Sequence, residues 1–195
     1  TVMELFANCM DWAKHRRRKA AAKMHLRLDL HSFLPSFAIV DTAGEHDNKR
    51  AREVCAGIAA GEIVIFDKAY VDFDHLADLD ARGVWWVTRA KDNMSFRVRR
   101  NLVKDEGKIV RDQMVQIDGG RVVRRVEAWL EVDGEERLMI FITNNPNWSP
   151  TSVCDLYRRR WDIEVFFKQV KQTLKLGTFL GHSVWRQLNL GADDN

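Results

Sequence analysis

Four polar residues near the carboxyl end of the chain have the types and spacing of a site that handles phosphates: Tyr157, Arg160, Glu164 and Lys171. At about 100° per residue, they fall within a ~60° arc of a helix predicted over residues 155–174. A carboxylate there can hold a divalent cation, and the flanking bases can bind a nucleic-acid backbone. The alternative is a helix with ordinary surface ion pairs. The arc alone leaves both interpretations open.

A second acidic residue follows a predicted buried strand. Residues 62–66, EIVIF, form the short continuous apolar run of a central strand covered on both faces, and Asp67 comes next. Open α/β sheets place their sites at the carboxyl ends of such strands. Asp67 alone is better explained as a helix cap or turn residue. Together with Glu164 it predicts a metal site, because Mg²⁺ takes carboxylate oxygens from different elements.

Further strands and helices are predicted around this strand from periodicity and end signals. The strands are residues 23–30, 36–40 and 84–88, and the helices are residues 48–60 and 72–82. Asp47 is a plausible N-cap of the first helix, and Gly61 and Gly83 end the two helices. Residues 1–12 are apolar without a clear period. The alternation of strands and helices predicts an α/β fold.

The character of the chain changes over residues 95–148. Helical periodicity gives way to β-like runs separated by Gly107, by residues 118–120 (DGG) and by residues 133–134 (DG), which are good hairpin signals. We predict an antiparallel β region inserted between strand 84–88 and the helix of Glu164. Ser149 and Pro150 then begin that helix.

Composition bounds the class of protein. The 195 residues are 46% hydrophobic and 30% charged, as in a soluble globular protein. The sequence contains no run of about 18 apolar residues, so no membrane span is predicted. Cys9, Cys55 and Cys154 are isolated, which fits reduced cytoplasmic thiols and gives no zinc spacing.

The distribution of basic residues says more than the net charge of +3. Arg16, Arg17 and Arg18 belong to a dense basic run that is either a solvated face or a segment that contacts phosphates. Arg89 and Lys91 follow strand 84–88, as loop residues or as basic side chains beside the site. The acidic pair favours phosphate contacts for the basic run.

The motifs together carry a resemblance to a known family. Tyr157, Arg160, Glu164 and Lys171 match the YREK signature of bacterial insertion-sequence transposases with a DDE catalytic core. The chain resembles the catalytic domain of these transposases over residues 1–183. The matching pieces are KMHLRLDL, SFAIVDTAGEHD, VIFDKAYVDF, VWWVTRAKDNM, and YRRRWDIEVFFKQVK with its LGTFLGHS ending.

The resemblance implies a ribonuclease-H-like mixed sheet flanked by helices, interrupted by the β-rich insertion. We expect a basic N-terminal segment over residues 1–22, the remnant of a core strand region. The catalytic core then covers residues 23–94 and 149–183, the insertion residues 95–148, and a frayed tail residues 184–195.

The resemblance also implies an activity, which is metal-dependent cleavage and strand transfer of insertion-sequence DNA ends. Asp67 and Glu164 would be the second and third acidic ligands of two Mg²⁺ or Mn²⁺ ions. The implied partners are double-stranded DNA, as transposon ends and target, and a second copy of the chain in a DNA-bound homodimer. The expected location is the bacterial cytoplasm, at the nucleoid and away from membranes. The implied DNA-binding residues are Tyr157, Arg160, Lys168, Lys171, Arg16, Arg17, Arg18, Arg89 and Lys91.

The chain departs from the family pattern at both ends. The first catalytic Asp of the family would lie just before Thr1, and the C-terminal continuation is short. Glu4 and Asp11, the nearby acids, do not end a recognisable strand. We therefore expect a core truncated at both ends and inactive alone. A non-catalytic DNA-binding remnant is the alternative, ahead of another nuclease on the same fold, which the YREK spacing disfavours.

Overall fold

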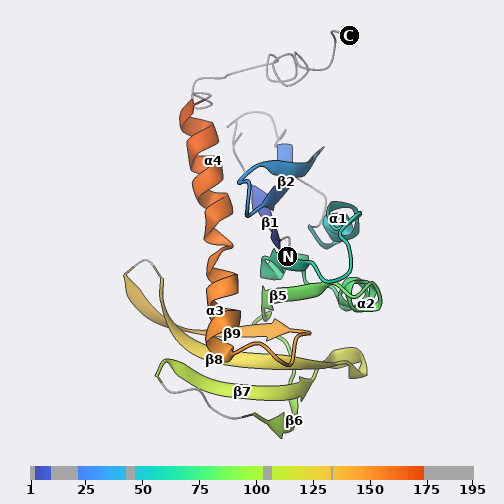
Figure 1. Cartoon of the computed structure of the whole chain (residues 1–195), viewed down its shortest axis with the longest axis vertical. Helices are drawn as coiled ribbons and strands as arrows, with labels where there is room; N and C mark the ends of the chain where they lie inside the picture. Colours follow the sequence, from blue (N-terminus) through green and yellow to red (C-terminus); the bar gives the residue numbers. More distant parts are fainter. Residues whose placement is uncertain (1–2, 10–21, 43–46, 103–106, 133, 174–195) are drawn as a thin grey trace.

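The computed structural model describes residues 3–9, 22–42, 47–102, 107–132 and 134–173 of the chain. They form a nine-stranded mixed sheet in the order β3-β2-β1-β4-β5-β9-β8-β7-β6, with helices on both faces (Figure 1). The strands are β1 (Met3–Cys9), β2 (Ala22–Asp29), β3 (Pro35–Thr42), β4 (Ile63–Phe66), β5 (Trp85–Arg89), β6 (Arg97–Asn101), β7 (Ile109–Gln116), β8 (Val122–Val132) and β9 (Glu135–Thr143). The helices are α1 (Asp47–Val54), α2 (Phe73–Ala81), α3 (Pro150–Arg158) and α4 (Trp161–Thr173), with short 3₁₀ turns η1 (Lys68–Tyr70) and η2 (Asp118–Gly120).

The first five strands have the predicted ribonuclease-H-like arrangement. Strands β1, β2 and β3 pair antiparallel, whereas β4 runs parallel to β1 and β5 runs parallel to β4. The parallel register places Phe66, the last residue of β4, between Phe6 of β1 and Thr88 of β5. The carboxyl ends of β4 and β5 therefore lie side by side, at the edge where Asp67 follows β4.

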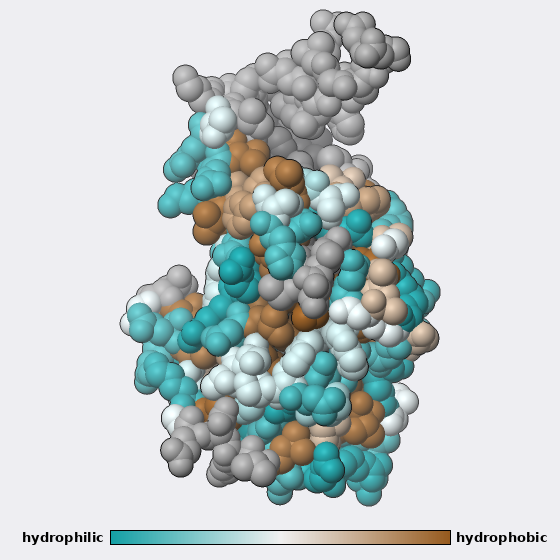
Figure 2. Space-filling view, in the orientation of Figure 1, coloured by the Kyte–Doolittle hydropathy of each residue, from teal (hydrophilic) through white to brown (hydrophobic). Residues whose placement is uncertain are grey.

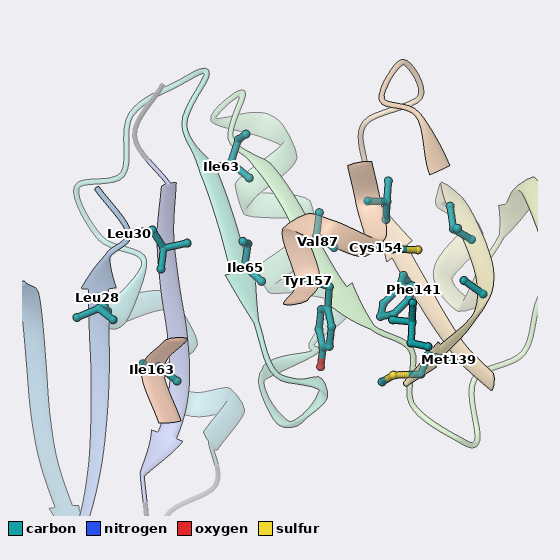
Figure 3. Packing of buried hydrophobic residues seen from close by; sticks show 14 of the residues in the cluster. Leu28, Leu30, Ile63, Ile65, Val87, Met139, Phe141, Cys154, Tyr157 and Ile163 are labelled. Carbon is teal, nitrogen blue, oxygen red and sulfur yellow. The ribbon is translucent and has the colours of Figure 1, made fainter. Parts of the chain in front are cut away.

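Strand β4 is buried on both faces, as its continuous apolar run predicts. Ile63 and Ile65 belong to the core that α3 and α4 cover, while Val64 and Phe66 belong to the core that α1 and α2 cover. Figure 3 shows the first of these cores, with Ile65 on its strand and Ile163 of α4 lower and to the left, over the neighbouring strand. A strand packed on both faces fixes the position of the residue that follows it.

The predicted β-rich insertion is confirmed as an antiparallel ladder, β6-β7-β8-β9. Strand β9 also pairs antiparallel with β5, so the insertion lengthens the core sheet instead of forming a separate one (Figure 1). Strand β6 ends the sheet, and all five of its residues are exposed. The insertion thus has a direct backbone connection to the strand beside β4.

Two elements differ from the sequence predictions. Helix α1 ends at Val54 instead of residue 60, because the chain turns through Gly57, whose φ of 76° is in the left-handed region. Strand β1 lies where the sequence shows no clear period. It is specified by long-range pairing with β2 and β4, which a local pattern does not report. Glu4 lies inside β1, opposite Val64, which is two residues before the last residue of β4.

The single helix predicted over residues 155–174 is instead two helices. The prediction that Tyr157, Arg160, Glu164 and Lys171 share one arc of one helix is therefore wrong. Helix α3 ends at Arg158, α4 begins at Trp161, and Arg159 and Arg160 form the turn between them. Short i→i+3 bonds tighten this turn, including Arg160 N to Tyr157 O at 2.9 Å. The two helices still follow one line across the sheet (Figure 1).

A buried ion pair ties the insertion to the start of α3. Asp112 of β7 accepts two hydrogen bonds from Arg124 of β8, at 2.8 and 2.7 Å, and both side chains are almost fully buried. Arg124 also donates to the carbonyl oxygens of Pro146 and Trp148 in the loop that leads to α3. Ser149 caps α3 as predicted, accepting from Ser152 N at 3.0 Å. This loop therefore has a fixed path into the helix pair.

Several predictions fall on residues beyond this description, among them the tail over residues 184–195. In the described ranges, no helix has both the length and the apolar character that a membrane crossing requires.

Candidate metal and nucleic-acid site

Asp67 lies at the end of β4 and directs its two carboxylate oxygens to different partners. It follows β4 directly, and its Oδ1 accepts a hydrogen bond from Ala69 N at 3.0 Å, which caps the η1 turn. Its Oδ2 faces α4, with the Nη1 of Arg160 at 3.9 Å. The sequence left a cap and a metal ligand as alternatives. One oxygen serves as the cap, and the other lies near the guanidinium of Arg160.

Glu164 lies in the first turn of α4, and its carboxylate meets the same guanidinium. The Oε1 of Glu164 is 2.8 Å from the Nη1 of Arg160. One nitrogen atom is thus within 4 Å of oxygens from both Asp67 and Glu164. The structure brings together two acids that are almost a hundred residues apart in the sequence, around one positive charge.

Two aromatic rings hold Arg160 between the acids. Its guanidinium carbon lies 5.8 Å from the centre of the Tyr157 ring and 5.4 Å from that of Trp161. The Arg160 side chain is only 14% exposed. Its Nε is buried and has no hydrogen-bond partner among the described residues. The guanidinium is therefore largely desolvated and is stabilised by the acids and the ring faces.

Tyr157 is a core residue of this site, with 2% of its surface exposed. Its ring packs against Phe141 of β9 at 4.9 Å between centroids, and Figure 3 shows it over the sheet next to Phe141. Burial raises the pKa of the Tyr157 hydroxyl to about 12, an effect that the charge of Arg160 partly offsets. Tyr157 therefore reaches a ligand only through Arg160, which it supports.

Basic side chains also lie at the carboxyl ends of β4 and β5, in the loops that follow these strands. Lys68 pairs with Asp92 at 2.8 Å, and Arg89 lies 3.8 Å from the same carboxylate. Lys91 donates to the carbonyl oxygen of Val71 at 2.7 Å, which ties the loop after β5 to the loop after η1. Lys68 hydrogen-bonds Asp92 and lowers the pKa of that carboxyl.

The remaining predicted DNA-binding residues are less fully placed. Lys168 is exposed on α4, one turn after Glu164. Lys171 belongs to α4, but its side chain lies outside the described residues, as do Arg16, Arg17 and Arg18. Figure 2 shows hydrophilic residues over much of α4 and over the strands of the insertion on this face.

Sequence reasoning missed three residues of this site, Lys68, Asp92 and Trp161. Lys68 could have been found from its place directly after Asp67, and Trp161 from its place after Arg160. Asp92 gave no signal of its own, because its pairing with Lys68 joins two loops 24 residues apart.

A groove of about 490 Å³ begins beside Arg89 and extends over the insertion. It combines basic and apolar side chains, and Arg125 lies 4.6 Å from the centre of the Phe96 ring. Its lining includes Arg89, Lys91, Phe96, Arg125, Arg137 and Leu138. The groove thus runs from Arg89 and Lys91 toward β8 and β9.

The donor set fits a hard divalent cation in part. Mg²⁺ is commonly held by one or two carboxylates together with water and substrate phosphates, and Asp67 and Glu164 supply two converging carboxylates. A single positive charge already lies where their oxygens meet. Within the described ranges, no group of three His, Cys, Asp or Glu side chains is arranged to hold a metal. Further oxygen ligands would come from phosphate or water.

Comparison with known families gives a match over most of the chain. The family model described as "Transposase DDE domain" matches residues 8–189. Among curated relatives, a putative transposase of Sinorhizobium fredii is 28% identical over 188 residues, which covers 88% of this chain and 50% of the relative. A probable insertion-sequence transposase of Geobacillus stearothermophilus is 25% identical over 196 residues, covering 96% of this chain and 51% of the relative. The chain spans about half the length of these relatives.

Solved structures give a much weaker likeness. The endonuclease V of Streptomyces avermitilis is 9% identical and has a TM-score of 0.35, with 73% of this chain and 65% of that chain covered. A likeness at that level says nothing about the substrate of this chain.

Proposed function

Because this chain belongs to the transposase DDE domain family, we propose that it is the catalytic part of an insertion-sequence transposase, which cleaves DNA ends and joins them to target DNA. The observation that supports this most directly is the convergence of Asp67 and Glu164 on one guanidinium. Members of the family generally use divalent metal ions. We propose Mg²⁺ or Mn²⁺, with two ions in the intact enzyme.

In this proposal, Asp67 and Glu164 hold the metal, and the basic residues hold the DNA backbone. The metal would activate the attacking oxygen and stabilise charge on the phosphate. Arg160, Lys168, Lys171, Arg89 and Lys91 would bind phosphate oxygens. Arg16, Arg17 and Arg18 would add contacts that do not depend on sequence. Tyr157 keeps the Arg160 guanidinium in place.

We further propose double-stranded DNA as the partner, as transposon ends and as target, with a homodimer on the DNA. The predicted place of work is the bacterial cytoplasm at the nucleoid, where this DNA lies. The proposed unit combines a catalytic core over residues 23–94 and 149–183 with the insertion over residues 95–148. The continuous sheet supports such a unit, because β9 pairs with β5.

The metal site is tested by titrating Mn²⁺ into the chain in a calorimeter. We expect binding that Asp67→Asn and Glu164→Gln each weaken by at least about tenfold, since a Mn²⁺ ligand is lost. Glu136→Gln is the matched control, because Glu136 is also an exposed glutamate in an ion pair, with Lys108 at 3.0 Å. Equal binding by all four proteins would rule out this site. Salt-sensitive DNA binding without any metal binding would favour a non-catalytic DNA-binding remnant.

A further inference from the structure

The place where a metal would bind is already the place of a positive side chain. The Nη1 of Arg160 is 2.8 Å from Glu164 Oε1 and 3.9 Å from Asp67 Oδ2. Among the described residues, the contact with Arg160 is the ion pair that Asp67 makes, and it is also the ion pair that Glu164 makes. The single guanidinium charge thus offsets half of the combined charge of the two carboxylates without a metal, and it lies closer to Glu164 than to Asp67.

This position is held by more than the two ion pairs. Arg160 lies in the tight turn between α3 and α4, so its backbone has little freedom. The rings of Tyr157 and Trp161 both lie beside the guanidinium and contact each other, and little of the side chain reaches solvent. Arg160 is therefore held in place within the site, whereas the neighbouring Arg159 is exposed.

A divalent cation on the same carboxylate oxygens would meet this guanidinium at close range. Like charges a few ångströms apart repel, and the repulsion is screened less around the Arg160 guanidinium, whose side chain is 14% exposed, than around Glu164, which is 54% exposed. Glu164 also cannot give its full charge to a cation while Oε1 accepts from Arg160. Binding of the metal therefore requires Arg160 to loosen its hold on one or both acids.

We propose that Arg160 is an internal counter-ion that competes with the metal, and that DNA phosphate releases it. A phosphate near the acids offers the guanidinium a second anionic partner, so DNA relieves the competition. Metal and DNA then bind with positive coupling that passes through Arg160. This inference rests on the proposed metal site of Asp67 and Glu164 and adds a regulation to that site.

The thermodynamic cycle makes the inference measurable. If DNA tightens metal binding by some factor, the metal must tighten DNA binding by the same factor. Removing the competing charge should raise metal affinity in the absence of DNA and abolish most of the coupling. A residue that only supported the fold would lower both affinities instead.

The experiment measures Mn²⁺ affinity by calorimetry with and without a short DNA duplex at low salt, for the wild-type chain and Arg160→Gln. We expect Arg160→Gln to bind Mn²⁺ roughly tenfold more tightly than wild type without DNA, which is within the usual range of coupling. We expect DNA to tighten Mn²⁺ binding at least about fivefold in wild type and hardly at all in Arg160→Gln.

Two further variants separate position from net charge. Arg159→Gln removes the same charge from the neighbouring exposed side chain, which pairs with Asp162 at 2.7 Å. Its Mn²⁺ affinity should stay near wild type. Arg160→Lys keeps the charge and should also stay close to wild type. A gain in Arg159→Gln as large as that in Arg160→Gln would overturn the inference, as would equal gains in both Arg160 variants.

Failure of the inference and failure of the metal site give different results. If Glu164→Gln abolishes Mn²⁺ binding while Arg160→Gln leaves it unchanged or weaker, the site stands and the counter-ion role is wrong. If Glu164→Gln leaves Mn²⁺ affinity unchanged, the proposed metal site is wrong, and so is the inference that rests on it. Circular dichroism melting curves of the variants show whether each is folded. If Arg160→Gln is not folded, Arg160→Met, which also removes the charge, takes its place, and the same gain in Mn²⁺ affinity and loss of coupling are expected.

Discussion

Asp67 uses its two carboxylate oxygens for different purposes, and this separates its structural role from its chemical one. Oδ1 caps η1 through Ala69 N, whereas Oδ2 faces Arg160. Asparagine keeps an oxygen that can accept the capping bond but removes the charge. Alanine removes both, so the two substitutions isolate the two roles.

We predict that Asp67→Asn keeps its stability within about 0.5 kcal/mol of wild type. Asp67→Ala should lose about 1 kcal/mol, as expected for a lost cap. Both should lose most of the Mn²⁺ affinity. Urea unfolding and calorimetry on the same samples provide the two readouts. Full Mn²⁺ affinity in Asp67→Asn would show that the carboxylate is not a ligand.

His75 gives a pH-dependent contribution to stability. Burial lowers the pKa of its imidazole to about 4, against the opposing charges of Asp78 and Asp72. Its Nε2 lies 3.3 Å from the Cys55 sulfur. Between pH 4 and 6.5 the unfolded chain binds a proton that the folded chain does not. This stabilisation is therefore complete above the unfolded pKa of about 6.5 and is lost as the pH falls toward 4.

The expected size of this contribution is roughly 3 kcal/mol between pH 7.5 and pH 4. His75→Gln, which does not titrate, should show a flatter fall in unfolding free energy over that range than wild type. Urea unfolding at several pH values measures the difference. Parallel curves for the two proteins would mean that His75 is not the source of the pH dependence.

At the scale of elements, local signals predicted most of what positions the site. Strands β4 and β5 and helix α2 were predictable because apolar runs, Asp72 as cap and Gly83 as stop are all local in sequence. Asp67 could be placed at a strand end for the same reason. Its approach to Glu164 could be suspected only from residue types, because distance in space is not a local property.

The errors have a common physical cause. Strand β1 depends on pairing with β2 and β4, and its own residues alternate too weakly to reveal it. The break at Arg159 and Arg160 contains no Gly or Pro, so nothing in the sequence interrupts a helix there. That break, however, is what places Arg160 between two acids and two rings. At both places, tertiary packing overrides the local secondary-structure propensity of the residues.

The ion pair of Asp112 and Arg124 has a predictable effect at this scale, because it fixes the loop before α3. Arg124→Met leaves the Asp112 carboxylate buried without a partner, and we expect a loss of roughly 3 to 5 kcal/mol. Replacing both residues by apolar ones should be markedly less destabilising than the single change. Urea unfolding of the single and double variants tests this.

The exposed pair of Lys108 and Glu136 is the control for this buried pair. Lys108→Gln should change the unfolding free energy by no more than about 1 kcal/mol. A loss in Arg124→Met as small as this would mean that the buried pair does not fix the loop.

At the scale of the whole molecule, the arrangement of charge matters more than its sum. The net charge is only +3, yet Lys68, Arg89 and Lys91 gather at the edge of the sheet that also holds Asp67. Lys168 adds an exposed charge on α4. Duplex DNA bound along this edge should release counterions, so affinity should fall steeply as salt rises.

We predict that Lys168→Gln reduces the slope of log affinity against log salt by roughly one unit. Lys108→Gln, which removes the same charge from the residue directly before β7, should leave the slope unchanged. Fluorescence anisotropy with a labelled duplex at several salt concentrations measures both slopes. Identical slopes for Lys168→Gln and wild type would place Lys168 outside the DNA interface.

The continuous sheet also has a consequence for self-association. Strand β6 is its last strand, so one side of its backbone has no neighbouring strand within the described sheet. Such a strand can template pairing with another chain and so begin aggregation. Strand β6 is short and carries Arg97, Arg99 and Arg100 among its five exposed residues. Two copies that approached edge to edge would bring these like charges together, so the arginines protect the extended sheet from intermolecular growth.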